Sequence, residues 1–368
     1  MSTPAPPAPG GRRRRAIRAA LCLSAGAIVW LSGACASRPA KVPPGTGAGS
    51  TPPAGEAGRG TSRPAQALPA TVRVRVISGG TARVLTLTLD DYVLGAVRAE
   101  MLPATLRAQP PSRALDVQAM VSRTYATANL RRHAADGYDL CDTTHCQVYR
   151  PAAAGEGPRD PAASAVNATR GQILTFQGRA IQALFHADCG GHTASAASVW
   201  GGTDAPYLEA VADWYCERRP SSGWSFVEAE AAVARALNAD ARTRVGERLR
   251  RVEVASRDAS GRALAVTLAG SRTISVRAEV FRAAMTQAFG PRAIRSTWFD
   301  VKRDGSRLRF SGVGFGHGVG LCQSGTLRRV EARQSPAEIL AHYFPGSRLQ
   351  SASTASARPD IAERLFGR

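Results

Sequence analysis

The chain has 368 residues and a formal net charge of +20 at pH 7, from 48 lysine and arginine residues against 28 aspartate and glutamate residues. Arginine supplies almost all of the positive charge, since Lys41 and Lys302 are the only lysines of the sequence. Such a balance favours contact with a polyanion. It does not point to nucleic acid, because the sequence holds no nucleic-acid motif with base-stacking aromatic residues.

The first 36 residues have the composition of an export leader. Arg12 to Arg15 form a positive segment, and the uncharged apolar run from Ala19 to Gly33 is short for a membrane span but suits a signal-peptide core. The segment 31–35, Leu-Ser-Gly-Ala-Cys, is an imperfect lipobox and favours lipidation of Cys35. Ordinary cleavage at Ala34-Cys35-Ala36 and an uncleaved membrane anchor are the alternatives.

Residues 37–70 are dominated by proline, glycine, alanine, serine and threonine. A segment with so few large apolar residues cannot bury enough surface to fold, so it predicts a disordered tether or a dispensable processing segment. For an exported domain on such a tether, the polyanion would be a wall polymer or lipid head groups. A solvated arginine-rich face that reflects compositional bias is the alternative.

The folded part begins with a predicted hairpin and two helices. Apolar residues alternate over 72–76 and 84–89, on either side of a Ser-Gly-Gly turn. A short helix is predicted from a cap at Asp90 to Val97, which places Glu100 just after its end, before a proline. A second helix is predicted over 112–130.

The remainder mixes strands and helices. It has predicted strands at 171–176, 180–185, 252–254, 264–268, 274–276 and 308–310, predicted helices at 225–244 and 278–289, and a capping box at 335–338 before a final helix. No internal repeat is evident. These patterns predict an α+β domain from 71 to 350 with mixed antiparallel sheets and packed helices, a small inserted module at 225–290, and a C-terminal tail from 351.

Glycine occupies every second position from Gly312 to Gly320, around His317. Glycine weakens an extended strand, so such a run marks a bulge, a tight bend or a surface that another group approaches closely. A flexible glycine loop is the plain alternative, and a buried core histidine is the alternative for His317.

Four ordered blocks of sequence carry a family resemblance. They are Glu100-Met101 with 118–126 (QAMVSRTYA), 141–149 (CDTTHCQVY), 185–193 (FHADCGGHT) running on to 199–202, and the glycine-histidine run. Together they resemble the stage II sporulation protein D and amidase enhancer family of bacterial cell-wall proteins. The resemblance spans roughly 72–344 and implies a fold built around a glycan-binding cleft.

The resemblance implies a lytic transglycosylase with Glu100 as its catalytic residue. Such an enzyme cuts peptidoglycan between N-acetylmuramic acid and N-acetylglucosamine, prefers strands without stem peptides, and leaves anhydro-muramic ends. A carboxyl beside apolar Met101 and Leu102 can have a raised pKa, as a general acid requires. One glutamate suffices, because a hydroxyl of the substrate attacks the anomeric carbon in place of water.

Two other functions remain open. Some members of this family act as activators, so the chain is alternatively a non-catalytic peptidoglycan-binding protein that stimulates a cell-wall amidase. A zinc-dependent amidase that uses His186 and His192 is the third reading.

Further side chains are predicted to bind substrate. They are Arg123, Tyr125, Gln147, Tyr149, His186, Asp188, His317 and Gln323, with Thr193, Trp200 and Tyr207 as further candidates. His317 is also expected to orient Glu100. Ser324 stands where the family carries a bulky aromatic residue after the glutamine, which would loosen one wall of the groove.

Cys141, His145 and Cys146 supply two thiolates and one imidazole within six residues, which suits a tetrahedral zinc with a fourth ligand from elsewhere or from water. The resemblance implies metal at these positions, in a structural role. A Cys141–Cys146 disulfide is the alternative. Of the seven cysteines, Cys22 and Cys35 lie in the leader, and three lie outside both the leader and this block. Cys189 and Cys216 are a disulfide candidate, whereas His186, Cys189 and His192 could form a second metal site.

Overall fold

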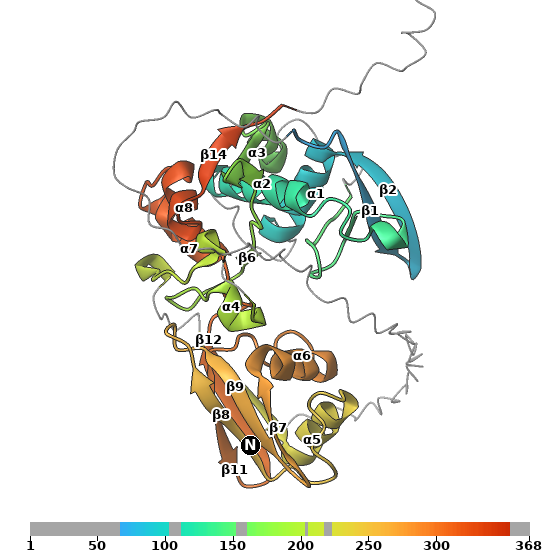
Figure 1. Ribbon diagram of the computed structural model, residues 1–368, viewed down its shortest axis with the longest axis vertical. Coiled ribbons are helices and arrows are strands. Elements are labelled where there is room, and N and C mark those ends of the chain that lie inside the picture. Colours follow the sequence, from blue (N-terminus) through green and yellow to red (C-terminus); the bar gives the residue numbers. More distant parts are fainter. Residues whose placement is uncertain (1–66, 103–111, 152–159, 203–204, 217–222, 354–368) are drawn as a thin grey trace, which may run out of the picture. The chain divides into compact units, whose positions relative to one another are not determined.

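The computed structural model describes residues 67–102, 112–151, 160–202, 205–216 and 223–353 (Figure 1). The predicted leader, the lipidation candidate Cys35 and nearly all of the predicted linker lie outside these residues. Within them, no helix combines the length and apolar character needed to cross a membrane. The last residues of the predicted linker join the fold, because Leu68 is buried and its N–H donates to the carbonyl of Ser353.

The predicted hairpin is present. Strand β1 (Thr71–Ser78) pairs antiparallel with β2 (Thr81–Thr88), and the short strand β3 (Leu140–Cys141) joins β1 in parallel. The alternating valines of β1 all point into the core. Because β3 carries the first cysteine of the Cys-His block, this pairing fixes that block against the start of the domain.

The first helix differs from the prediction at both ends. Helix α1 (Leu89–Met101) is capped by Thr88, whose hydroxyl accepts from the Asp91 N–H at 3.1 Å, and it continues past Val97 to Met101. It continues because Val97 and Met101 are both buried in the core. Glu100 therefore lies in the last turn of the helix and not after it.

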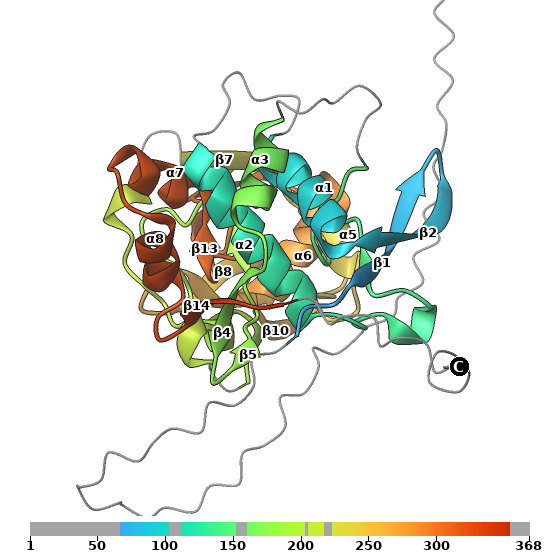
Figure 2. The same cartoon turned by 90° about the horizontal axis from the view of Figure 1, so that it is seen from above.

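Helix α2 (Ser112–Ala128) is the centre of this part of the fold. It contacts α1, α3 (Pro161–Ala168), α7 (Gln323–Glu331) and α8 (Pro336–Tyr343), and Figure 2 shows it between α1 and α8. The capping box of α8 at Ser335 and Glu338 forms as predicted. Almost every α2 residue is buried. Side chains of this helix can therefore take part in a site only along the edge of the helix that contacts α7.

Small sheets complete this part. Strands β4 (Gln172–Phe176), β5 (Arg179–Ala180) and β14 (Arg348–Ser351) form one sheet in the order β14-β4-β5. Strand β6 (Phe185–His186) pairs in parallel with β13 (Leu321–Cys322), which brings the histidine block beside the end of the glycine run. The segment between them in sequence includes α4 (Ala196–Trp200) and the short 3-10 turns Pro206–Leu208 and Trp214–Cys216.

The predicted inserted section has a hydrophobic core of its own, which runs from Trp224 to Phe310. It consists of two three-stranded sheets, β10-β9-β8 and β11-β12-β7, with two helices. The elements are β7 (Gly223–Ala229), α5 (Glu230–Ala239), β8 (Arg251–Arg257), β9 (Ala263–Ala269), β10 (Thr273–Arg277), α6 (Ala278–Phe289), β11 (Phe299–Asp304) and β12 (Arg307–Val313).

The predicted helix over 225–244 was wrong at both ends, because α5 covers only Glu230–Ala239. Residues 223–229 form a strand that pairs with β12, with Trp224 opposite Gly312 and Phe226 opposite Phe310. The helix begins only at Glu230, with the alanine-rich stretch that has high helical propensity. The three predicted strands that follow and the helix over 278–289 are confirmed.

Candidate functional site

Glu100 is half-buried at the end of α1, where one backbone donor reaches its carboxylate. Its Oε1 accepts the Val148 N–H at 2.9 Å. Burial raises the pKa of Glu100 to about 7, against the opposing effect of that hydrogen bond, and no neighbouring charge among the described residues contributes to the shift. A carboxyl group that is half protonated near neutral pH can both give and take a proton, which is the requirement for general acid-base catalysis.

Hydrogen-bonded amide side chains extend from the loop that contacts Glu100, across α2, to the end of the glycine-rich segment. Gln147, one residue before Val148, donates to the Ser122 carbonyl at 3.4 Å. The Ser122 hydroxyl accepts from Gln118 at 3.1 Å, and the Gln118 Oε1 accepts from Gln323 at 3.2 Å. Two of the predicted substrate residues, Gln147 and Gln323, thus share one network with the loop that holds Glu100.

The glycine run packs closely against another backbone segment of the same chain. Its last four glycines have positive φ angles between 72° and 108°, a conformation that L side chains rarely adopt. Phe315 bridges Asp188, and a Cβ on Gly316 would lie 2.8 Å from the Cβ of His186. The close approach predicted from the sequence is real, but the group that approaches is the histidine block of the same chain.

Gly320→Ala should therefore lower the free energy of unfolding by about 3 kcal/mol or more. Gly320 has φ +72°, and an added Cβ would overlap the Leu184 carbonyl oxygen, which is fixed backbone. Gly305→Ala is the matched control, because Gly305 also has positive φ but has open space around it, and it should cost about 1 kcal/mol. Urea denaturation measures both values. Equal losses in the two variants would contradict the close packing.

His317 is half-buried and neutral. Its Nδ1 accepts the Val319 N–H at 3.0 Å, and its ring lies 5.6 Å from that of His186 and 5.2 Å from that of Trp200. Burial lowers the pKa of His317 to about 3, helped by the nearby positive charge of Arg282. Within the described chain no hydrogen bond joins His317 to Glu100, so it does not orient the carboxylate directly. The half-exposed Trp200 remains available to a sugar ring.

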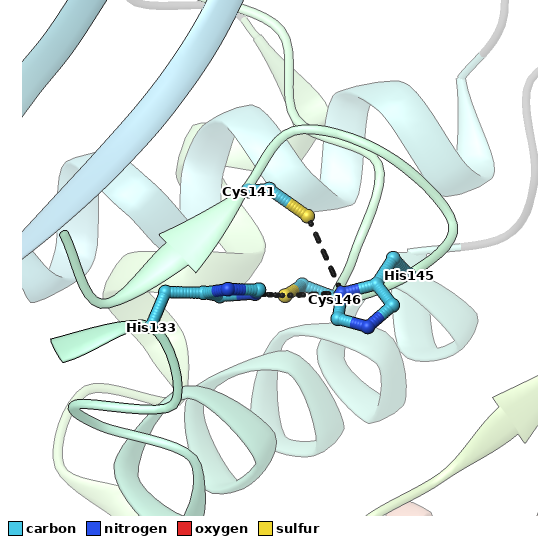
Figure 3. Close-up of side chains that lie close together, drawn as sticks. All are labelled: His133, Cys141, His145 and Cys146. Atoms are coloured by element: carbon cyan, nitrogen blue, oxygen red, sulfur yellow. Dashed lines mark hydrogen bonds between the residues drawn. The ribbon is translucent and has the colours of Figure 1, made fainter. Parts of the chain in front are cut away.

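The Cys-His block forms a four-ligand group with one residue that the sequence reading missed (Figure 3). The ligand atoms of His133, Cys141, His145 and Cys146 lie within 4.8 Å of one another. The His133 Nε2 is 3.4 Å from the Cys146 sulfur, and the His145 Nδ1 is 3.7 Å from each sulfur. Two thiolates and two imidazoles are a common structural zinc set.

His133 is also oriented as a metal ligand would be. Asp136 lies one short 3-10 turn further on, and its Oδ2 is 3.4 Å from the His133 Nδ1, so the Nε2 is free to face the sulfurs. Hydrogen bonds from the Cys146 thiol and the Thr143 hydroxyl lower the pKa of Cys141 to about 4, despite burial. The donor set and its geometry fit a tetrahedral thiophilic ion, and the loop it would fix is the one that carries Gln147 and Val148.

Comparison with known proteins agrees with these blocks. Residues 78–176 match the family model described as Stage II sporulation protein, and residues 219–320 match a domain of unknown function. An uncharacterized protein from Brachyspira hyodysenteriae is 31% identical over 265 residues, 71% of this chain and 66% of that protein. The Bacillus subtilis Stage II sporulation protein D is 27% identical over 296 residues, 76% of this chain and 80% of that protein.

A second Bacillus subtilis protein, the Amidase enhancer, is 27% identical over 293 residues, 68% of this chain but 40% of that protein. The chain belongs to the stage II sporulation protein D and amidase enhancer family. It spans about two thirds of the Brachyspira relative and less than half of the Amidase enhancer.

Several family-motif residues that were predicted to bind substrate are used by the fold instead. Arg123 is fully buried and donates to the carbonyls of Val166 and Thr169 at 3.2 and 2.8 Å and to the Asp90 carboxylate at 3.2 Å. Its guanidinium joins α1, α2 and α3, so we correct the prediction that it contacts a glycan.

The aromatic and acidic candidates also face the protein. Tyr125 is buried in the core, and Tyr149 stacks on Tyr92 with ring centroids 5.6 Å apart. The Asp188 carboxylate accepts the Gly190 N–H at 2.8 Å and stabilises the turn after it. Two further candidates also contact the protein itself. Thr193 is buried and exchanges hydrogen bonds with Val211, and the Tyr207 ring packs on Phe176.

The remaining cysteine predictions require correction. The five described cysteines are free thiols, so neither the Cys141–Cys146 nor the Cys189–Cys216 disulfide is formed in this structure. Among the described residues, no group of side chains that could hold a metal ion contains His186 or His192 together with Cys189. The His192 Nδ1 lies 2.7 Å from the Thr193 carbonyl oxygen, and the buried His186 has its Nδ1 3.2 Å from the Val319 carbonyl oxygen. Ser324 is half-buried at the start of α7, and its N–H donates to the Ala187 carbonyl.

Proposed function

We propose that this protein is an exported lytic transglycosylase that cuts peptide-stripped peptidoglycan strands, with Glu100 as the general acid and base. The observation that carries the proposal is the half-buried Glu100, whose pKa is raised to about 7 with no second carboxylate of the described residues contributing to the shift. A hydrolase of the usual two-carboxylate type would need a second acid at 5–10 Å to act on water or on the sugar.

The reaction can be written with Glu100 alone. The protonated carboxyl gives its proton to the glycosidic oxygen as the bond from the anomeric carbon breaks, and N-acetylglucosamine leaves with a new hydroxyl. The resulting carboxylate takes the proton of a hydroxyl on the same muramic-acid residue, whose oxygen bonds to the anomeric carbon. An anhydro ring forms, and Glu100 is again protonated.

The Val148 N–H stabilises the ionised stage of this cycle, because it already points at the Glu100 Oε1. We assign the half-buried Gln323 and the half-exposed Trp200 to holding the strand. Gln147 and Gln118 are each 1% exposed, so they act from within the fold, where they connect Gln323 to the loop that carries Val148. Zinc, when bound by His133, Cys141, His145 and Cys146, would supply a structural cross-link for the Gln147–Val148 loop.

A non-catalytic activator of a cell-wall amidase is the second candidate. It is favoured by the name of the Amidase enhancer relative and by the burial of Arg123, Tyr125 and Tyr149, which leaves fewer side chains for a glycan than the sequence suggested. The zinc-amidase reading finds less support, since His186 and His192 share no metal-type group in the described chain.

The deciding experiment incubates the purified full chain with glycan strands whose stem peptides have been removed, and analyses the products by mass spectrometry. New anhydro-muramic ends are the expected result. Firm binding without new ends, together with stimulation of a separate amidase, would replace the transglycosylase by the activator. Release of stem peptides from intact peptidoglycan by this chain alone would indicate an amidase.

A further inference from the structure

A second group of metal-type ligands lies apart from the Cys-His block. It consists of Cys189, Asp213, Cys216 and Cys322, which we call the three-cysteine cluster, and all four are buried with their ligand atoms within 4.8 Å of one another. The sulfurs of Cys216 and Cys322 are 3.5 Å apart, and the Cys189 sulfur is 3.5 Å from the Asp213 Oδ2. Sulfurs bound to one tetrahedral zinc at about 2.3 Å lie about 3.8 Å apart, whereas a disulfide needs about 2.05 Å.

The fold brings these ligands together from three distant segments. Cys189 follows β6, Asp213 directly precedes the 3-10 turn at 214–216, and Cys216 is the last residue of that turn. Cys322 ends β13, 133 residues after Cys189. Backbone donors point at the sulfurs. Cys322 accepts the N–H groups of Cys189 and Gly325, both at 3.2 Å, and Cys189 accepts that of Gly191 at 3.4 Å. Such donors stabilise thiolates more than neutral thiols.

Buried positive charge surrounds the cluster. Arg329 is 4% exposed and its guanidinium is 3.1 Å from the Asp213 Oδ1. Arg262 is 1% exposed and donates to the Cys189 carbonyl at 2.7 Å, but its Nε and Nη1 find no hydrogen-bond partner. No carboxylate of the described chain forms an ion pair with Arg262 within 4 Å; the nearby Asp258 accepts backbone N–H groups of its own turn.

If the thiols are neutral, Asp213 pairs with Arg329, whereas Arg262 forms no ion pair within 4 Å in the described chain and has only the more distant Asp258 as a counter-charge. A divalent ion with three thiolates and one carboxylate carries two negative charges, which matches the two arginines. Burying a cation without an opposite charge is costly, so the surroundings favour the charged cluster.

We propose that Cys189, Asp213, Cys216 and Cys322 bind a second thiophilic divalent cation, of which Zn²⁺ is the chemically best suited. Binding replaces the protons of three thiols, so three protons are released for each ion bound. Tyr343 donates to the Asp213 Oδ2 at 2.5 Å, and Arg329 holds the Oδ1, so the carboxylate is fixed as a ligand by its neighbours.

The ion would link β6, β13 and the 205–216 segment at one point. Cys322 is the register partner of His186 and directly precedes Gln323, so the cross-link would fix two residues of the candidate site. The binding of this ion does not depend on whether the protein cleaves glycan.

Metal content of the full chain tests the proposal. After purification with zinc and exhaustive dialysis, plasma mass spectrometry should find two zinc ions per wild-type chain. A Cys141→Ala/Cys146→Ala variant should keep one ion, and a Cys216→Ala/Cys322→Ala variant should also keep one. With cobalt in place of zinc, the first variant should retain strong thiolate-to-cobalt absorption.

The main rival is a disulfide between two of the three cysteines. A Cys141→Ala/Cys146→Ala chain that folds but binds no zinc would overturn the proposal, as would a disulfide among Cys189, Cys216 and Cys322 found by peptide mapping without reduction. If a variant does not fold, the wild type decides, because two ions per chain support the second site and fewer than two overturn it.

Discussion

Glu100→Gln should reduce the formation of anhydro-muramic ends by about 10³-fold, with little change in binding to peptide-stripped strands. Glutamine keeps the shape of the side chain and can still accept the Val148 N–H, but it can neither give nor take a proton at neutral pH. Product formation is followed by mass spectrometry, and binding by sedimentation with insoluble peptidoglycan.

Glu253→Gln is the matched control for this substitution. Glu253 lies on β8 with an exposed carboxylate 3.6 Å from Arg251, in the section with its own core, and its loss should leave cleavage unchanged. Cleavage that survives in Glu100→Gln at more than a tenth of the wild-type rate would remove Glu100 from the catalytic role.

The same carboxyl sets a pH dependence. The pKa of Glu100 is raised to about 7, and the general acid must be protonated, so kcat/KM of the wild type should fall about tenfold per pH unit above pH 7. The group leaves kcat/KM unchanged well below that value. A profile that stays flat from pH 6 to pH 9 would contradict this assignment.

Stability should also fall as the pH rises, but over a lower pH range. The pKa of Glu100 is higher in the folded chain than the usual 4.5, so ionisation weakens the fold progressively between about pH 4.5 and 7, and the full cost is present above pH 7. Glu100→Gln should therefore be more stable than wild type by about 1–3 kcal/mol at pH 8 and about equally stable at pH 4. Denaturant titrations at the two pH values measure the difference, which a surface glutamate would not show.

Loss of the Cys-His centre is the second large effect. A Cys141→Ala/Cys146→Ala chain should lose one bound zinc, several kcal/mol of stability and at least tenfold in cleavage. Cleavage should fall because the metal ligand Cys146 is directly followed by Gln147, which hydrogen-bonds Ser122, and by Val148, which hydrogen-bonds Glu100. Without the cross-link, the loop is still held at its start by the short β3 pairing and at its end by the Arg150 N–H, which donates to the Gly95 carbonyl, but the turn between them loses its anchor.

A strong chelator applied to the wild type should cause at least these losses, because it would remove both proposed ions, and added zinc should reverse them. His342→Gln is a control, since His342 is a half-buried histidine on α8 that belongs to no metal-type group of the described chain. An unchanged melting temperature after complete removal of zinc would show that the centre does not hold this loop.

Sequence patterns predicted elements well where the signal was local. The alternating valines of β1, the helical period over 278–289 and the capping box at Ser335 each depend on residues within one or two turns. They failed where packing decided. Burial of Met101 extends α1, and pairing with β12 makes a strand of 223–229 despite the alanine-rich stretch that follows.

The candidate site shows the same division. The motif containing Glu100 and the cysteine spacing indicated the candidate acid and three of the four candidate metal ligands from sequence alone. His133 was missed because it lies eight residues before Cys141, and a 3-10 turn and the β1–β3 pairing bring it back. Arg123 and Tyr125 belong to the same motif as Gln118, yet they lie on sides of α2 that other helices cover.

By itself, the sequence determined the family and the α+β class, and it singled out Glu100 and the closely spaced cysteines as candidates, because these depend on residue chemistry and short spacing. Only the tertiary structure decided which side chains meet. Burial sets the pKa of Glu100, α2 turns some motif residues inward and others toward α7, and the β6–β13 pairing gathers Cys189, Cys216 and Cys322 with Asp213. Several of these contacts, such as those of Cys322 with Cys189 and Cys216, join residues more than a hundred positions apart, which no local pattern encodes.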